Sequence, residues 1–152
     1  MRGSRLTLVL MSMLTALFVL RVCAQLLQAL FPVDWIPEFE AWHTGLLPYP
    51  VLLASQFGIV GLMSFVLHRV RNGTIRARPW KYRVCLVFGG AYFAVMAFRW
   101  LAGLTFLADQ AWFAKSLPAF FHLVLASFVL LLGLHIRRRK RNPKIFSYSP
   151  RG

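Results

Sequence analysis

The sequence predicts an all-α integral membrane protein with four transmembrane helices in an up-down bundle. Residues of the types AVILMFWYC make up 59% of the 152-residue chain, against about 45–50% in soluble domains even when Gly is counted. Charged residues make up 14%, which is too little charge to cover the surface of a soluble globule. Four apolar stretches are also close to the ~20 residues that a helix needs to cross the hydrocarbon core.

The four stretches together form one membrane domain that occupies residues 1–152. Their approximate bounds are residues 6–31, 51–67, 84–107 and 117–136. Prolines lie only at or beyond the ends of the spans, where a missing N–H is tolerated. These prolines are Pro32, Pro48, Pro50, Pro79 and Pro118.

The basic residues predict the orientation of these spans. Of the 18 Lys and Arg residues, 15 precede the first span, lie between the second and third, or follow the fourth, and residues 137–152 form a basic tail. All four acids (Asp34, Glu38, Glu40 and Asp109) fall in the two opposite loops. The positive-inside rule therefore places both termini in the cytoplasm, and we expect a multi-pass protein of the bacterial inner (plasma) membrane.

The first outer loop, residues 32–50, predicts an amphipathic segment in the outer interface. Its large apolar residues recur at spacings of 4, 3, 4 and 3, which is a helical period. They are Trp35, Phe39, Trp42, Leu46 and Tyr49. We expect Trp35, Trp42 and Tyr49 to be interface anchors, because Trp and Tyr favour the headgroup level. A lid over a site below the loop is the alternative.

The two halves of the chain resemble each other at an offset of 78 residues. Arg21, Ala24 and Leu26 align with residues of the third span, namely Arg99, Ala102 and Leu104. The sequence thus indicates two tandem hairpin repeats, related by a twofold axis along the membrane normal. A chance match between apolar segments is the alternative.

Small residues predict close helix contacts on two spans, because they let backbones approach. The second span carries Ala54, Gly58 and Gly61 at i, i+4 and i+7, and the third carries Gly90, Ala94 and Ala97. The ordinary Gly and Ala content of apolar helices explains both sets equally well.

Two arginines inside the spans mark the candidate site. Arg21 and Arg99 each lie about 22 Å from the inner face, at 1.5 Å per residue, hence in the outer third of the bilayer. A membrane-embedded arginine costs at least ~2.5 kcal/mol, so each should find a partner or reach the headgroups. Gln25 and Gln28 continue the polar stripe of Arg21 at i+4 and i+7.

Further polar residues lie at a similar depth on the other spans. We therefore expect a ligand-binding pocket that suits an anion or a polar headgroup, formed by Arg21, Gln25, Gln56, Tyr92, Arg99 and His122. Two guanidiniums repel each other, so at least one should be satisfied by a group from outside the chain. Counter-ions from the outer loops would instead make the cluster structural.

We expect no cofactor and no metal, with haem or quinone as the alternatives. His122 and His135 are 13 residues apart on one span, about 220° around a helix, so both should not face one bundle interior; this argues against haem. Nucleic acid is not an expected partner, because the basic tail has neither a folded module nor interleaved aromatic residues. No catalytic set of residues is visible.

The first functional hypothesis is an accessory or structural subunit of a larger membrane complex, because the chain shows no catalytic set and only short loops. The alternative is a protein that binds or carries an amphiphile, a lipid or quinone, in an outer-leaflet pocket around Arg21 and Arg99. The expected partners are the lipid bilayer, anionic lipid headgroups at the basic face and other membrane subunits.

Overall fold

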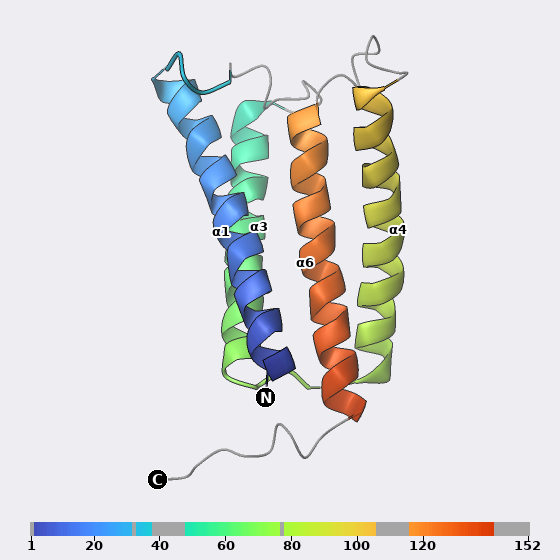
Figure 1. The fold of residues 1–152 in the computed structure, drawn as a ribbon. Coiled ribbons are helices and arrows are strands. Elements are labelled where there is room, and N and C mark those ends of the chain that lie inside the picture. Colours follow the sequence, from blue (N-terminus) through green and yellow to red (C-terminus); the bar gives the residue numbers. More distant parts are fainter. Residues whose placement is uncertain (1, 32, 38–47, 77, 106–115, 142–152) are drawn as a thin grey trace.

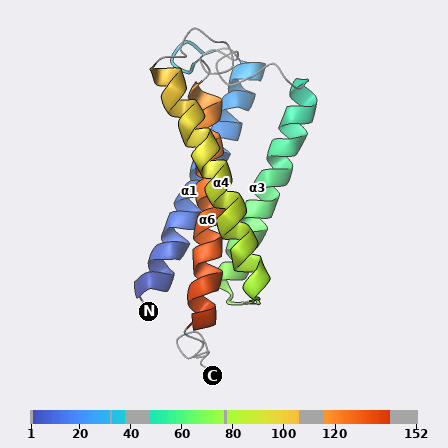
Figure 2. The same cartoon turned by 90° about the vertical axis from the view of Figure 1, so that its right-hand side faces the viewer.

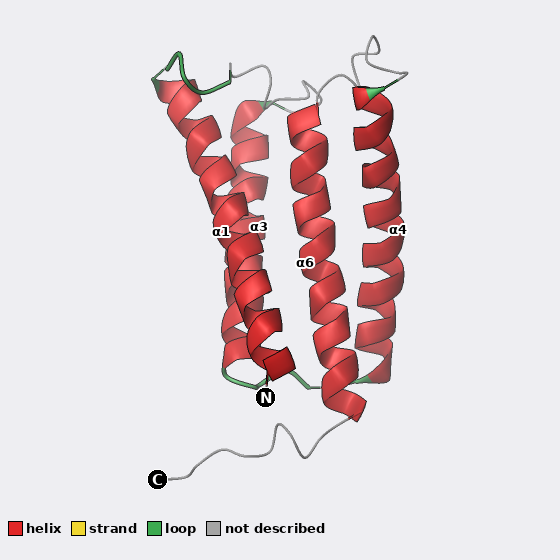
Figure 3. Ribbon diagram, in the orientation of Figure 1, coloured by secondary structure: helices red, strands yellow, loops and turns green. Residues whose placement is uncertain are grey.

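The computed structural model of the chain describes residues 2–31, 33–37, 48–76, 78–105 and 116–141. Within these residues the regular structure is entirely helical, as Figure 3 shows. The helices are α1 (Arg2–Leu30), α3 (Tyr49–Arg71), α4 (Pro79–Leu104) and α6 (Ser116–Arg141). Each is long and apolar enough to cross a membrane, so the prediction of four spans is confirmed and the chain has the build of a multi-pass membrane protein.

The helices begin and end near the predicted span boundaries. At their basic ends they continue beyond the apolar stretches: α3 continues to Arg71 and α6 to Arg141. Pro50 and Pro79 lie in the first turns of α3 and α4, where their fixed φ suits a helix start. The third span ends earlier than residue 107, because Thr105 closes α4 with its N–H on the Ala102 carbonyl.

The four helices alternate in direction. Figure 1 shows the start of α1 and the end of α6 at one end of the bundle, together with the connection from α3 to α4. We call this the basic end, because the last turn of α6 carries four cations there, Arg138, Arg139, Lys140 and Arg141. Figure 2 shows α3 diverging from the other three helices toward the opposite end.

Helix α6 is the centre of the packing. The most extensive contact is between α4 and α6; α1 contacts both α6 and α3, whereas α3 packs extensively only on α1. Figure 1 accordingly places α6 between α1 and α4. The contact of α1 with α6 has no equally extensive counterpart between α4 and α3. The packing is thus not symmetric, and the tandem repeat stays a prediction.

Large apolar side chains hold α1, α3 and α6 together. The buried cluster consists of Met11, Phe18 and Val22 from α1, Met63 and Val70 from α3, and Phe121, Val124 and Phe128 from α6. No residue of α4 belongs to this cluster among the described residues. Helix α4 therefore joins the bundle by other means.

Glycines bring α4 and α6 close together. A Cβ placed on Gly133 would lie 3.0 Å from the side chains of Cys85 and Leu86, and one on Gly89 would lie 3.2 Å from Val129 and Leu130. A side chain at either glycine would require the facing side chains to shift by a few tenths of an ångström.

The predicted small-residue stripes are not the contact surfaces. Gly58 and Gly61 on α3, and Gly90 on α4, have nothing within 4 Å of an added Cβ. The prediction for the third span missed by one residue, since Gly89 rather than Gly90 faces α6. The prediction for the second span was wrong, because that face of α3 meets no other described helix.

The amphipathic segment predicted for the first outer loop is described only at its two ends, so it stays a prediction. Trp35 lies in a turn after α1 and is 81% exposed, and Tyr49 is the first residue of α3. Since the two residues belong to different elements, one helix does not carry both. Trp42 lies outside the described residues, as do the acids Glu38, Glu40 and Asp109.

Candidate functional site

The polar stripe of α1 faces the bundle interior. Arg21, Gln25 and Gln28 are all buried, with Gln25 completely so. The Gln28 side-chain oxygen accepts the backbone N–H of Val33 at 3.0 Å, which closes the end of α1. Gln28 is therefore used structurally, whereas Arg21 and Gln25 face the neighbouring helices.

A glutamine pair joins α1 to α3. The Gln56 Nε2 donates to the Gln25 Oε1 at 2.8 Å, and both side chains are buried. This bond leaves the Gln25 Nε2 and the Gln56 Oε1 as buried atoms without a hydrogen-bond partner among the described residues. Turning both amides over preserves the bond, so one donor and one acceptor stay unpaired in either arrangement.

A tyrosine–histidine pair joins α4 to α6 in the same way. The Tyr92 hydroxyl and the His122 Nδ1 are 2.8 Å apart, and the two rings meet edge to face. Because Nδ1 is engaged, Nε2 is the ring nitrogen of His122 that can serve another partner. Each helix hairpin, α1 with α3 and α4 with α6, is thus joined by a hydrogen-bonded pair of polar side chains.

Arg21 lies between the two hairpins and is 8% exposed. Its Cζ lies 5.7 Å from the ring centre of Phe18 on its own helix and 5.2 Å from that of Phe121 on α6. These are cation–π contacts. The Arg21 Nε is buried without a hydrogen-bond partner in this part of the chain.

A cavity of about 220 Å³ lies against these groups, between α1, α3 and α6. Its polar lining consists of Arg21, Ser55, Gln56 and His122, and the remainder is apolar or aromatic. Three of the six predicted site residues thus line one cavity. Gln25 and Tyr92 lie behind two of them and hold Gln56 and His122 by the bonds described above.

The sixth predicted residue, Arg99, is buried on α4 but does not line the cavity. Its charge acts on both Tyr92 and His122, and the charge of Arg21 acts on His122 as well. The charges of two arginines, one on α1 and one on α4, therefore act on one imidazole of α6. The loop acids that were considered as counter-ions lie outside the described residues, so the expected external partner stays a prediction.

The sequence interpretation missed the aromatic surroundings of Arg21. Phe18 precedes it by three residues on α1, so helical spacing could have indicated this contact, but nothing in the sequence relates Phe121 to Arg21.

The argument against haem assumed that His122 and His135 should not both face the bundle interior, and this assumption was wrong. His135 is 3% exposed and His122 lines the cavity, so both face the protein interior. This is possible because the central α6 has neighbours on several sides. The two histidines are still roughly 20 Å apart along α6 at 1.5 Å per residue, which is too far for ligation of one iron.

No protein-family model, curated protein or solved structure matches this chain. The functional argument therefore depends on the cavity and its residues.

Proposed function

We propose that the cavity binds the polar head of an amphiphile, a lipid or a quinone, and that the protein acts as a binding or carrier protein. One observation carries this proposal: a buried guanidinium borders the cavity, and its Nε has no hydrogen-bond partner among the described residues. A buried polar group without a partner costs about 1–3 kcal/mol, and more for a charged group. A ligand that accepts from Arg21 would recover that free energy on binding.

The cavity dimensions favour a head group rather than a whole ligand. Pockets for drug-sized molecules occupy about 300–1,000 Å³, and this cavity is smaller, at about 220 Å³. Its walls beyond the polar patch are apolar, with Leu52, Ile59 and Leu125 among them. Since α3 packs extensively only on α1, the side between α3 and α6 is where an apolar tail would leave the cavity.

The unpaired atoms indicate the chemistry of the head. Arg21 Nε is a donor, so the ligand must offer an acceptor such as a carbonyl, hydroxyl or phosphate oxygen. The unpaired Gln56 atom is the acceptor Oε1, or the donor Nε2 if both amides are turned over, and a hydroxyl on the ligand would pair with either. Carbonyl and hydroxyl groups are the head groups of quinones and quinols, and phosphate is that of phospholipids.

Native mass spectrometry of the full chain, released from lipid nanodiscs that contain a quinone, tests the proposal. The wild type should retain a bound lipid or quinone that Arg21→Met and Gln56→Leu lose. Thr15→Val is the matched control, because Thr15 is also buried on α1 and its hydroxyl bonds only its own helix, at the Met11 carbonyl. Equal retention by all four proteins would overturn the proposal.

A second candidate function is an accessory subunit of a larger membrane complex. The observation that favours it is the open face of α3, where Gly58 and Gly61 have nothing within 4 Å of an added Cβ. Small residues on a free face suit the approach of a partner helix. Gly61→Leu should reduce the mass of a complex isolated in mild detergent, and a wild type that runs only as a monodisperse monomer would count against this function.

The proposed topology places the basic end in the cytoplasm of a bacterium, with the cavity toward the outer leaflet. It is supported by the concentration of Lys and Arg in the connection from α3 to α4 and in the last turn of α6.

A further inference from the structure

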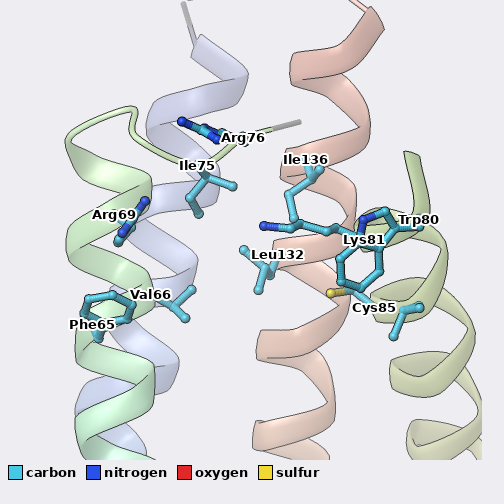
Figure 4. Close-up of a pocket in the computed structure, with 11 residues that line it drawn as sticks. Phe65, Val66, Arg69, Ile75, Arg76, Trp80, Lys81, Cys85, Leu132 and Ile136 are labelled. Atoms are coloured by element: carbon cyan, nitrogen blue, oxygen red, sulfur yellow. The ribbon is translucent and has the colours of Figure 1, made fainter. Parts of the chain in front are cut away.

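A second groove lies at the basic end, away from the cavity around Arg21. It has a volume of about 520 Å³ and is formed by α3 and α4 as its two sides, with α6 as its floor. Figure 4 shows Leu132 and Ile136 of α6 between the two sides. This groove shares no lining residue with the other cavity, so it is a separate site.

Cations supported by aromatic rings stand on both sides of the groove. On α3, the Arg69 Cζ lies 5.6 Å from the ring centre of Phe65; on α4, the Lys81 Nζ lies 5.9 Å from that of Trp80. Figure 4 shows the Lys81 side chain extending from α4 toward α3, with Arg76 above the same opening. Three cations and no acid line the groove, so its charge is uncompensated by its own lining.

We propose that this groove is a specific site for one anionic phospholipid, with the lipid phosphate held among Arg69, Arg76 and Lys81. Basic pockets between transmembrane helices suit phosphate head groups because Arg donates two parallel hydrogen bonds and Lys supplies a compact charge. Trp80 is 57% exposed beside the cations, as expected of a ring that lies at the level of the headgroups.

The apolar part of the groove points to a lipid rather than a soluble anion. Its lining includes Val66 on α3 and Leu132 on α6. The cavity around Arg21 is lined on the same two helices by Ile59 and Leu125, each seven residues, or two helical turns, away. At 1.5 Å per residue, the two sites are separated by roughly 10 Å along the helices. An acyl chain that starts at the basic groove therefore has an apolar path between α3 and α6.

Exposed cations elsewhere at the basic end provide a control that distinguishes a specific lipid site from general attraction to the membrane. Arg83 on α4 and Arg137 on α6 are exposed and do not line the groove. The double variant Arg83→Gln/Arg137→Gln therefore changes the net charge by as much as Arg69→Gln/Lys81→Gln does. If lipid binding reflects general electrostatic attraction, both double variants should weaken it equally. If the groove is a specific site, only Arg69→Gln/Lys81→Gln should weaken it.

The experiment uses the full chain in nanodiscs of phosphatidylglycerol and phosphatidylcholine, with native mass spectrometry to count the retained lipids. Wild type and the Arg83/Arg137 variant should retain one phosphatidylglycerol. Arg69→Gln/Lys81→Gln should bind it roughly 25-fold more weakly, at about a factor of five per cation near an anionic head group. Leu132→Trp keeps every charge and fills the groove floor, so it should also lose the lipid while thermal unfolding shows that the helices persist.

Three outcomes would overturn the proposal. Equal loss in the two double variants would show general attraction only, and equal retention of phosphatidylcholine would show that the head charge is not recognised. Displacement of the lipid by glycerophosphate in solution would show that the site takes the phosphate without its chains. The inference is independent of the Arg21 cavity, whose variants should leave phosphatidylglycerol at the basic end unchanged.

Discussion

Arg21 is an unusual residue because it is charged and buried, lies against two aromatic rings, and has a buried Nε without a hydrogen-bond partner among the described residues. A side chain selected for stability alone would not have this character, since insertion of arginine into the bilayer costs at least ~2.5 kcal/mol. Two cation–π contacts return about 0.5–1 kcal/mol each. The difference is a free-energy cost that the protein bears in the absence of a ligand.

Replacement of Arg21 by Met should therefore stabilise the ligand-free protein. Met keeps an unbranched apolar stem and removes the charge, so the free energy of unfolding should rise by about 1 kcal/mol, the insertion cost less the cation–π contacts. Thermal denaturation in a lipid-free detergent measures the change. A large loss of stability would mean that the guanidinium is structural and would weaken the proposed binding role.

The glutamine pair should contribute measurable coupling between α1 and α3. Gln25→Leu and Gln56→Leu each leave one buried amide without its partner, so each single variant should lose more than half of what the double variant loses. A double-mutant cycle should give a coupling of about 0.6–1.7 kcal/mol, the range for hydrogen bonds between membrane helices. Additive effects would show that the bond does not form in the membrane.

Part of the candidate site was predictable because helical spacing and depth in the membrane are both properties of the sequence. Arg21, Gln56 and His122 lie at similar depth on three helices, and the structure brings them to one cavity. The role of Phe121 could not be predicted, since it depends on how α6 is rotated about its axis. The position of Arg99 was likewise only partly predictable. Its depth in the membrane follows from the sequence, but its absence from the cavity lining depends on how α4 packs.

Helices α4 and α6 show how glycine position, rather than glycine content, determines a contact. Gly89 and Gly90 are neighbours in the sequence, yet only Gly89 lies against α6, because consecutive residues on a helix are 100° apart. The sequence pattern predicted a contact at Gly90, which was wrong, because both glycines fit a small-residue spacing equally well. Substitution of a glycine that contacts the neighbouring helix and of one that does not should therefore affect stability differently.

Gly133→Ala should destabilise the α4–α6 hairpin, whereas Gly90→Ala should not. The new methyl at residue 133 would lie 3.0 Å from Cys85 and Leu86, tight enough to cost about 1–3 kcal/mol, while residue 90 has open space. Alanine at residue 90 should be neutral or stabilise the helix by up to about 0.5–1 kcal/mol. Thermal unfolding of the two variants measures the contrast, and equal effects would contradict the described packing.

The described part of the molecule is an open bundle with two cavities lined by α3 and α6. The number of helices and their ends were predictable, since they follow from hydrophobic length and from proline positions. The order of packing was not, because four apolar helices offer many arrangements of similar composition. That α3 and α4 leave a groove between them, with α6 as its floor, is visible only in the structure.

Reporter fusions test the proposed orientation of the bundle. Green fluorescent protein fused after residue 152 should fluoresce, and alkaline phosphatase fused there should be inactive, since the basic end is expected in the cytoplasm. Alkaline phosphatase inserted within residues 106–115 should be active. Reversed activities at the two positions would place the basic end, and with it the proposed phospholipid site, on the outer side.

The central position of α6 also has a consequence for biosynthesis. α6 is the last of the four helices to leave the ribosome, yet both α1 and α4 depend on it as a packing partner. Until it is inserted, α4 has no extensive neighbour, and the buried cluster of α1 and α3 lacks the three side chains that α6 supplies. We therefore expect α1 and α3 to be able to associate first, and α4 to gain its main packing partner only after α6 has been inserted.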